Sequence, residues 1–407
     1  MTRRLIGILA CFLISDATPA WSAESVTITD VPDYTWYAGC FGSASGNLMG
    51  YWDRHGFPRF YIGPTAGGVA PLDSFGLNAG IRSLWASKAG FDGRPPDQPG
   101  HLDDYWEYYI DEVSYSYEST APDPYVTAGR PEHPPDCLGD FTGASQNKWA
   151  DLDGECSGNI DAFSFVFWDK TGSKRHNYAP PPDQNGPVRD IQSGFKAWTE
   201  YKGSSCDVFS QLAEFNPNFP PGLGFHFEDL KAEIDAGYPV LIFMQNPDEF
   251  SRSLPGNPRA NPRVHGMVAY GYILTDSGAP AVRYRTSWGS GDNSLSLWTS
   301  DAWEAGLAVR GFITYHPLPK ITEVKPGKEN IVIKWEGPSS TVTDSLTGAS
   351  TPVNWYVVEK TQSLTNPNFA PISAPSLDHE ATIPTYPDQQ AFFRVKLLTP
   401  EQAGQSR

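Results

Sequence analysis

The stretch that decides the fold is residues 36–55, WYAGCFGSASGNLMGYWDRH, in which a cysteine stands directly before an amphipathic pattern. Apolar or aromatic side chains recur there at spacings of three and four residues, at Ala44, Leu48, Trp52 and His55. This period predicts a helix over residues 41–55. Cys40 therefore opens the helix, where unsatisfied N–H groups and the positive end of the helix dipole stabilise a thiolate over a thiol. Such a placement is typical of a cysteine nucleophile.

Two other roles for Cys40 stay open at this point. Cysteine is among the most buried residue types, and the cysteines of exported proteins usually pair. Four cysteines follow residue 23, namely Cys40, Cys137, Cys156 and Cys206. They could form two disulfides in three different arrangements. A bridged Cys40 would be structural and would carry no chemistry.

A histidine opens the second informative stretch, residues 264–272 (VHGMVAYGY). The apolar run predicts a strand over residues 264–273, and a turn then leads to a further strand over residues 281–286. His265, at the start of its strand, is placed either to face a cleft or to lie satisfied in the core. Residues 227–236 predict a helix and residues 238–244 a buried strand.

Together these segments resemble the papain-fold cysteine peptidases, in particular the secreted bacterial branch akin to the bacteriocin double-glycine leader peptidases (peptidase family thirty-nine). The nucleophile segment of that family, Trp-Tyr-x-Gly-Cys followed further on by Gly-Tyr-Trp-Asp, is matched by residues 36–40 and 50–53. Residues 265–272 match its base segment, and residues 231–240 match its Lys-x-Glu-Ile-Asp-x-Gly-x-Pro-Val stretch. The resemblance covers about residues 31–288. It implies an α+β papain-like fold with an N-terminal helix carrying the Cys and an antiparallel sheet carrying the His.

The resemblance also implies a mechanism, in which Cys40 attacks a carbonyl carbon and His265 takes the thiol proton. The backbone N–H of Cys40 and one side-chain donor would hold the oxyanion. The Gln that supplies this donor in the family is absent, and Thr35 and Tyr34 occupy the places five and six residues before Cys40. The residue that orients the histidine aligns with Thr286, whose hydroxyl can accept from Nδ1–H.

Asp292 and Trp288 complete the set of supporting candidates, Asp292 as a substitute orienting group from the next loop. Loss of an oxyanion donor costs about 2.7–4 kcal/mol of transition-state stabilisation. The sequence therefore supports two functions. One is an exported cysteine peptidase acting on a peptide or protein substrate. The other is a catalytically degenerate papain-fold module that binds a peptide, a glycan or a cell-surface partner.

The organisation of the chain indicates export. Residues 1–23 show the charged, apolar and small-residue order of a signal peptide, with cleavage expected after Ala20 or Ser22. This order predicts a secreted or periplasmic protein in which disulfides are permitted. Residues 24–316 form the predicted peptidase-type domain, with irregular insertions around residues 92–190. Residues 317–407 predict a small β-sandwich that resembles fibronectin-like or immunoglobulin-like accessory modules.

The net charge and the absence of certain motifs exclude several classes of binding partner. The formal net charge of −17 and the lack of a Lys/Arg cluster argue against a nucleic-acid binder and against an anionic membrane surface. The acidic loop at residues 151–155 does not fit an EF-hand, and no zinc-ligand spacing occurs. We expect no cofactor, no metal ion and no stable membrane insertion. The C-terminal module is a candidate for cell-surface or glycan contact.

Overall fold

The computed structural model covers all 407 residues and describes a set of ordered ranges within them. These ranges are 24–34, 39–61, 69–73, 138–142, 171–177, 191–215, 221–245, 264–275, 277–288, 294–303, 306–385 and 390–405. The proposed signal peptide and most of the predicted insertion, including the acidic loop at residues 151–155, lie outside the described residues. Among the described residues, no helix is long and apolar enough to span a bilayer.

The described helices are short, apart from the first. They are α1 (Gly39–Arg54), α5 (Leu138–Thr142), α6 (Ile191–Tyr201), α7 (Phe227–Asp235) and α8 (Pro400–Gln405). The helices predicted over residues 41–55 and 227–236 are thus confirmed as α1 and α7.

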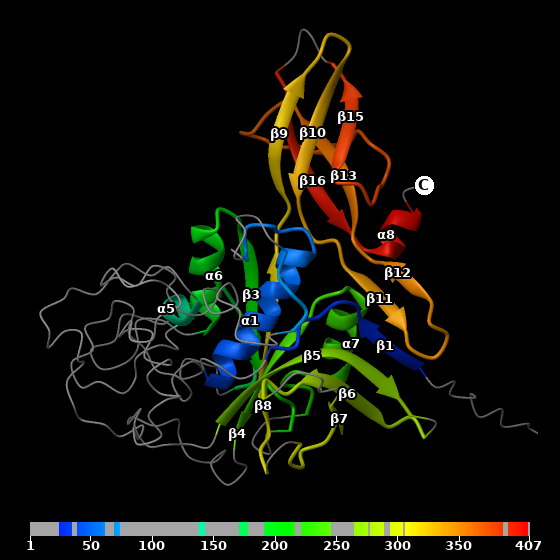
Figure 1. Ribbon diagram of the computed structural model, residues 1–407. Helices are drawn as coiled ribbons and strands as arrows, with labels where there is room; N and C mark the ends of the chain where they lie inside the picture. Colours follow the sequence, from blue (N-terminus) through cyan, green and yellow to red (C-terminus); the bar gives the residue numbers. More distant parts are fainter. Residues whose placement is uncertain are drawn as a thin grey trace, which may run out of the picture.

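A large antiparallel sheet forms the body of the molecule (Figure 1). Its strands run in the order β12-β11-β1-β5-β4-β8-β3-β2, with β6 added to β5 and β7 to β6. The bounds are β1 (Glu24–Ile28), β2 (Arg175–His176), β3 (Cys206–Leu212), β4 (Val240–Gln245), β5 (Val264–Leu274), β6 (Pro280–Arg285), β7 (Ser294–Leu297), β8 (Ala308–Pro317), β11 (Thr341–Asp344) and β12 (Ser350–Pro352). The strands expected over residues 238–244, 264–273 and 281–286 are confirmed as β4, β5 and β6.

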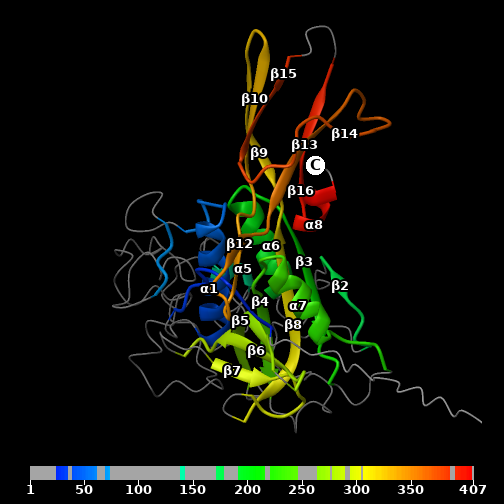
Figure 2. The same ribbon diagram turned by 90° about the vertical axis from the view of Figure 1, so that its right-hand side faces the viewer.

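Helix α1 packs along this sheet and runs antiparallel to β4 (Figures 1 and 2). Near its C-terminal end, Trp52 contacts Tyr238, just before β4 begins, with ring centroids 5.4 Å apart. Near its N-terminal end, Phe41 contacts Phe243 of β4 at 5.5 Å. Helix α1 is buried on nearly every side, since Ser43, Asn47 and Asp53 are covered as well as its apolar residues, and each large apolar side chain contributes about 1.5–3 kcal/mol by burial.

Two small antiparallel sheets form the C-terminal part and stand above the main sheet in Figure 1. One contains β9 (Lys320–Pro326), β10 (Asn330–Glu336) and β15 (Glu380–Pro384), and the other contains β13 (Trp355–Thr361), β14 (Ala370–Pro371) and β16 (Phe392–Leu398). Side chains from both sheets share one core, made of Ile333, Trp335, Tyr356, Val358 and Ile383. The short strands expected in residues 317–407 are therefore present.

The hairpin β11–β12 lies between these two parts in a way that the sequence did not indicate. The sequence predicts a domain boundary at residue 316, with residues 317–407 in a separate module. In the structure, however, β11 of that module pairs with β1 and extends the main sheet. Neighbouring contacts reinforce this attachment. The Ser340 hydroxyl donates to the Gly237 carbonyl at 2.9 Å, and the Ser339 N–H donates to the His55 carbonyl at 3.1 Å. The C-terminal part is thus joined to the main sheet by backbone pairing as well as by the chain.

Candidate active site

Cys40 lies in the first turn of α1, as the second residue of the helix. Its side chain is a thiol rather than half of a disulfide, and 5% of the residue's surface is exposed. The first turn of α1 carries no acidic side chain that would oppose negative charge on the sulfur. The N–H groups of this turn and the helix dipole would stabilise negative charge on the sulfur, whereas its burial opposes ionisation.

The imidazole of His265 is completely buried near the start of β5. Its Nε2 lies 2.5 Å from the carbonyl oxygen of Thr286. Because a carbonyl oxygen can only accept, this contact assigns the ring proton to Nε2 and leaves Nδ1 with a bare lone pair. Among the residues that the structure describes, none makes a hydrogen bond to the buried Nδ1. Burial lowers the pKa of His265 to about 4, although the bond to Thr286 opposes this shift, so the ring is neutral near pH 7.

Trp288 covers one face of this imidazole. The two rings stack with centroids 4.3 Å apart and an interplanar angle of 7°. Ser287, between Thr286 and Trp288, has a φ of 64°, in the left-handed region that non-glycine residues rarely occupy. This conformation lets the Thr286 carbonyl and the Trp288 ring contact the same histidine. The imidazole is thus held in place by the hydrogen bond at Nε2 and by the stacking of Trp288 on one face of the ring.

Packing between Phe41 and Gly266 brings the first turn of α1 to the start of β5. A Cβ atom placed on Gly266 would lie 2.7 Å from Cε1 and 2.9 Å from Cγ of the Phe41 ring. The absence of a side chain at Gly266 is therefore what lets the helix approach the strand so closely. Phe41 follows Cys40 and Gly266 follows His265, so the residues next to the predicted pair are in direct contact.

The predicted role of Thr286 needs correction. The sequence assigned its hydroxyl to Nδ1–H, but its main-chain carbonyl binds Nε2 instead. The hydroxyl oxygen accepts from the N–H of Trp288 at 3.3 Å. The physical reason is the left-handed turn at Ser287, which directs the backbone of this segment, rather than its side chain, toward the histidine.

Tyr34 is not brought to Cys40 as an oxyanion donor. Its hydroxyl donates to the Pro71 carbonyl at 2.9 Å and lies against Gly50. Ten residues of helix separate Gly50 from Cys40, which corresponds to about 15 Å along the axis. The other two support candidates, Thr35 and Asp292, lie outside the described residues.

One residue at this end of the sheet was missed by the sequence reasoning. Gln245, the last residue of β4, is buried, and none of the described residues makes a hydrogen bond to its Oε1. A single polar residue after an apolar run is an ordinary strand ending, so the sequence carried no signal for it. Within the described ranges, no group of His, Cys, Asp and Glu side chains is arranged to hold a metal ion.

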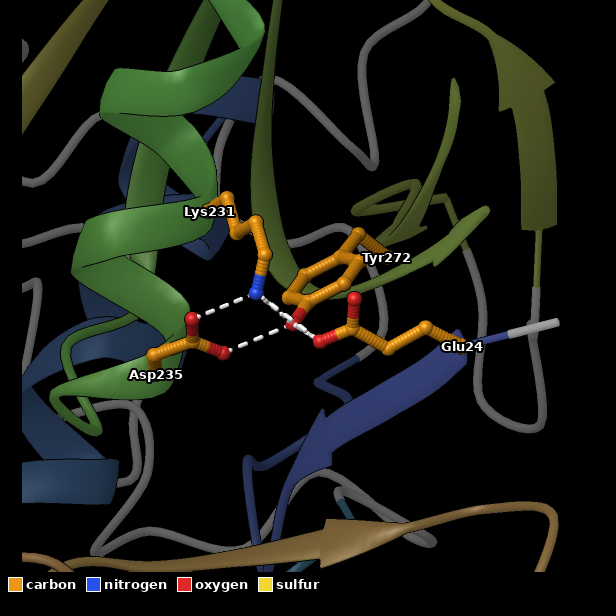
Figure 3. Close-up of polar contacts among 4 residues, drawn as sticks. All are labelled: Glu24, Lys231, Asp235 and Tyr272. Carbon is orange, nitrogen blue, oxygen red and sulfur yellow. Dashed lines mark hydrogen bonds and ion pairs between the residues drawn. The ribbon is translucent and has the colours of Figure 1, made fainter. Parts of the chain in front are cut away.

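A second polar cluster lies elsewhere, where α7, β1 and β5 meet (Figure 3). Lys231 donates to Asp235 at 2.7 Å, to Glu24 at 2.9 Å and to the Tyr272 hydroxyl at 2.5 Å. Burial opposes ionisation of Glu24, but hydrogen bonds from Tyr272 and Lys231 outweigh it and lower the pKa of that carboxyl. Because every member is paired within the cluster, its role is to hold β1 against the helix and the sheet.

Comparison with known proteins finds no matching family model, no matching curated protein and no matching solved structure. The chain is an α+β protein in which an N-terminal helix with a buried Cys40 packs on a large antiparallel sheet, followed by small C-terminal antiparallel sheets.

Proposed function

We propose that this protein is an exported thiol hydrolase of the papain-like cysteine peptidase type, with Cys40 as nucleophile and His265 as base. The observation that carries the proposal is the state of His265. Its proton is held on Nε2 by the Thr286 carbonyl, and its buried Nδ1 has no hydrogen-bond partner among the described residues. A neutral imidazole with a bare nitrogen is the form that a general base requires.

In the proposed reaction the Cys40 sulfur attacks the carbonyl carbon of a peptide bond while its proton passes to Nδ1 of His265. The carbonyl oxygen becomes an oxyanion, which the backbone N–H of Cys40 can hold. The imidazolium then gives its proton to the leaving nitrogen as the C–N bond breaks. Water, activated by the same Nδ1, hydrolyses the thioester and restores the thiol.

Other features of the chain agree with this proposal. The signal-like residues 1–23 support a secreted or periplasmic location, and the net charge of −17 disfavours nucleic acid as a partner. We propose a peptide or protein substrate, which the resemblance to cysteine peptidases implies. The C-terminal sheets are an accessory part, for which we propose contact with a cell surface or a glycan.

The test is selective alkylation by iodoacetamide near pH 6, with the labelled cysteine located by mass spectrometry. We expect rapid labelling of Cys40 that is abolished in His265→Ala. Cys206 is the internal control, because it is also buried and burial raises its pKa to about 12. Cleavage of a peptide library by the wild type and its loss in Cys40→Ala complete the assignment. Labelling of Cys40 no faster than Cys206, or unchanged in His265→Ala, would overturn the proposal.

A binding module without catalysis is the second candidate. It is favoured by the orientation of His265 through a carbonyl dipole, which brings no net charge to stabilise an imidazolium. That candidate predicts slow labelling of Cys40, no cleavage of any library peptide, and retention of a peptide, a glycan or a surface partner on the immobilised protein.

A further inference from the structure

Gln245 is a buried amide at the end of β4. The residue is 5% exposed, and its Oε1 is completely buried without a hydrogen-bond partner among the described residues. Buried polar atoms in folded proteins nearly always have partners, so an exception calls for a functional explanation. Because Oε1 can only accept hydrogen bonds, its missing partner is a donor, either an N–H or an O–H group.

The position of Gln245 follows from the regular register of β4 and β5. Phe243 and Gln245 are two residues apart and therefore face the same side of the sheet, the side on which Phe243 contacts Phe41 of α1. The opposite end of α1 is fixed at the beginning of β4, where the Tyr51 hydroxyl donates to the Gly237 carbonyl at 2.9 Å. Gln245 consequently lies at the end of β4 where α1 begins.

Its strand partner points to the same location. Gln245 pairs with Val264, the residue directly before His265. One end of the sheet thus contains the Gln245 amide, the helix turn that carries Cys40 and the strand start that carries His265. No other described Gln is placed in this way.

We infer that Gln245 is a substrate-positioning residue that binds a backbone peptide group next to the bond being cleaved. This inference rests on the proposed function and names the recognised chemistry within it. Oε1 accepts the N–H of that peptide group, and Nε2 is able to donate to a substrate carbonyl. A substrate without that N–H leaves the buried oxygen unpaired, so the site prefers amide backbones over ester backbones.

The decisive experiment compares peptides with matched depsipeptides, in which an ester oxygen replaces one backbone N–H near, but not at, the scissile bond. In the wild type, one such replacement is expected to lower kcat/KM by about tenfold to a hundredfold. In Gln245→Met, the all-amide peptide shows a loss of the same size, and the ester replacement at that position has no further effect. Uniform losses for every peptide and depsipeptide would indicate a purely structural residue and refute the inference.

Stability gives a second readout. Gln245→Met replaces an unsatisfied buried amide by an apolar side chain of similar size, so the midpoint of urea unfolding is expected to stay the same or rise. The matched control is Gln192→Met. Gln192 is equally buried, but it donates to the Arg175 and Val208 carbonyls and accepts from Ser210. We expect that control to unfold at lower urea and to keep kcat/KM per folded molecule.

The two proposals fail in different ways. If the wild type cleaves peptides with dependence on Cys40 and His265, but Gln245→Met keeps the wild-type ratio of amide to ester substrates, the inference is wrong and the proposed function stands. A bound water that satisfies Oε1 would produce this result. If the wild type neither cleaves peptides nor shows His265-dependent labelling, the proposed function is wrong and the role of Gln245 falls with it.

Discussion

Substitution of Gly266 by alanine tests the contact that places the helix turn of Cys40 against the strand of His265. The new Cβ would lie 2.7 Å from Cε1 and 2.9 Å from Cγ of Phe41. Ordinary carbon–carbon contacts are about 3.5–4.0 Å, so the ring must retreat by about 1 Å. Phe41 is fully buried and is backed by Phe243, which leaves little room for that retreat. Overpacking of this kind costs about 1–3 kcal/mol.

Urea unfolding and the rate of Cys40 alkylation are the two assays for Gly266→Ala. We expect a lower unfolding midpoint by the amount given above and slower alkylation, because α1 moves away from β5. Gly404→Ala is the matched control, since a Cβ on Gly404 in α8 meets nothing within 4 Å. That control is expected to be neutral, or stabilising by up to about 1 kcal/mol through helix propensity.

The double variant Gly266→Ala/Phe41→Leu separates the steric effect from other causes. A smaller side chain at residue 41 accommodates the new methyl group, so the double variant should lose less stability than the sum of the two single variants. A coupling below about 0.5 kcal/mol, or a Gly266→Ala protein that unfolds and alkylates like the wild type, would refute the close packing of α1 on β5.

Two further predictions concern other parts of the fold. Ser287→Gly fits the left-handed backbone, so this variant should keep the alkylation rate of Cys40 and the urea midpoint. Ser287→Val should lower the free energy of unfolding by about 1–3 kcal/mol and slow alkylation. Equal behaviour of the two variants would contradict the role of this turn. At His226, burial lowers the pKa, but the hydrogen bond and charge of Glu214 outweigh it and raise the pKa above its usual value. The stabilisation from the His226–Glu214 pair should be complete below about pH 6.5 and disappear as the pH rises through the raised pKa of His226. His226→Gln should remove that part of the pH dependence of the unfolding free energy. An unchanged pH profile in this variant would refute the pairing.

Much of the site scaffold could be predicted from the sequence because it rests on local patterns. The period of residues 41–55 predicts the helix α1, and the apolar runs of β4 and β5 predict the central strands. Cys40 and His265 were placed correctly on their elements for this reason. Local periodicity is encoded within a few residues, so it needs no knowledge of the rest of the chain.

The parts that could not be predicted depend on tertiary contacts. No sequence signal marks Ser287 as left-handed. The sequence therefore could not predict that Thr286 binds His265 through its main-chain carbonyl and not through its hydroxyl. The pairing of Val342 with Ile28 joins opposite ends of the chain and has no local signature. Tyr34 aligns with the oxyanion Gln of the family that the sequence resembles, whereas its hydroxyl lies beside Gly50, far along the helix.

The carbonyl at Thr286 has a consequence for how the proposed pair would work. A carboxylate would stabilise an imidazolium by its charge, but a carbonyl dipole does so only weakly, and burial lowers the pKa of His265 to about 4. The resting imidazole is then neutral, rather than one half of a preformed ion pair with Cys40. In the proposed reaction the proton would move during attack, and the base would remain available until the pH falls toward 4. The proposed reactivity would therefore depend on the placement of the imidazole by the Ser287 turn and the Trp288 ring, rather than on a charged side chain at residue 286.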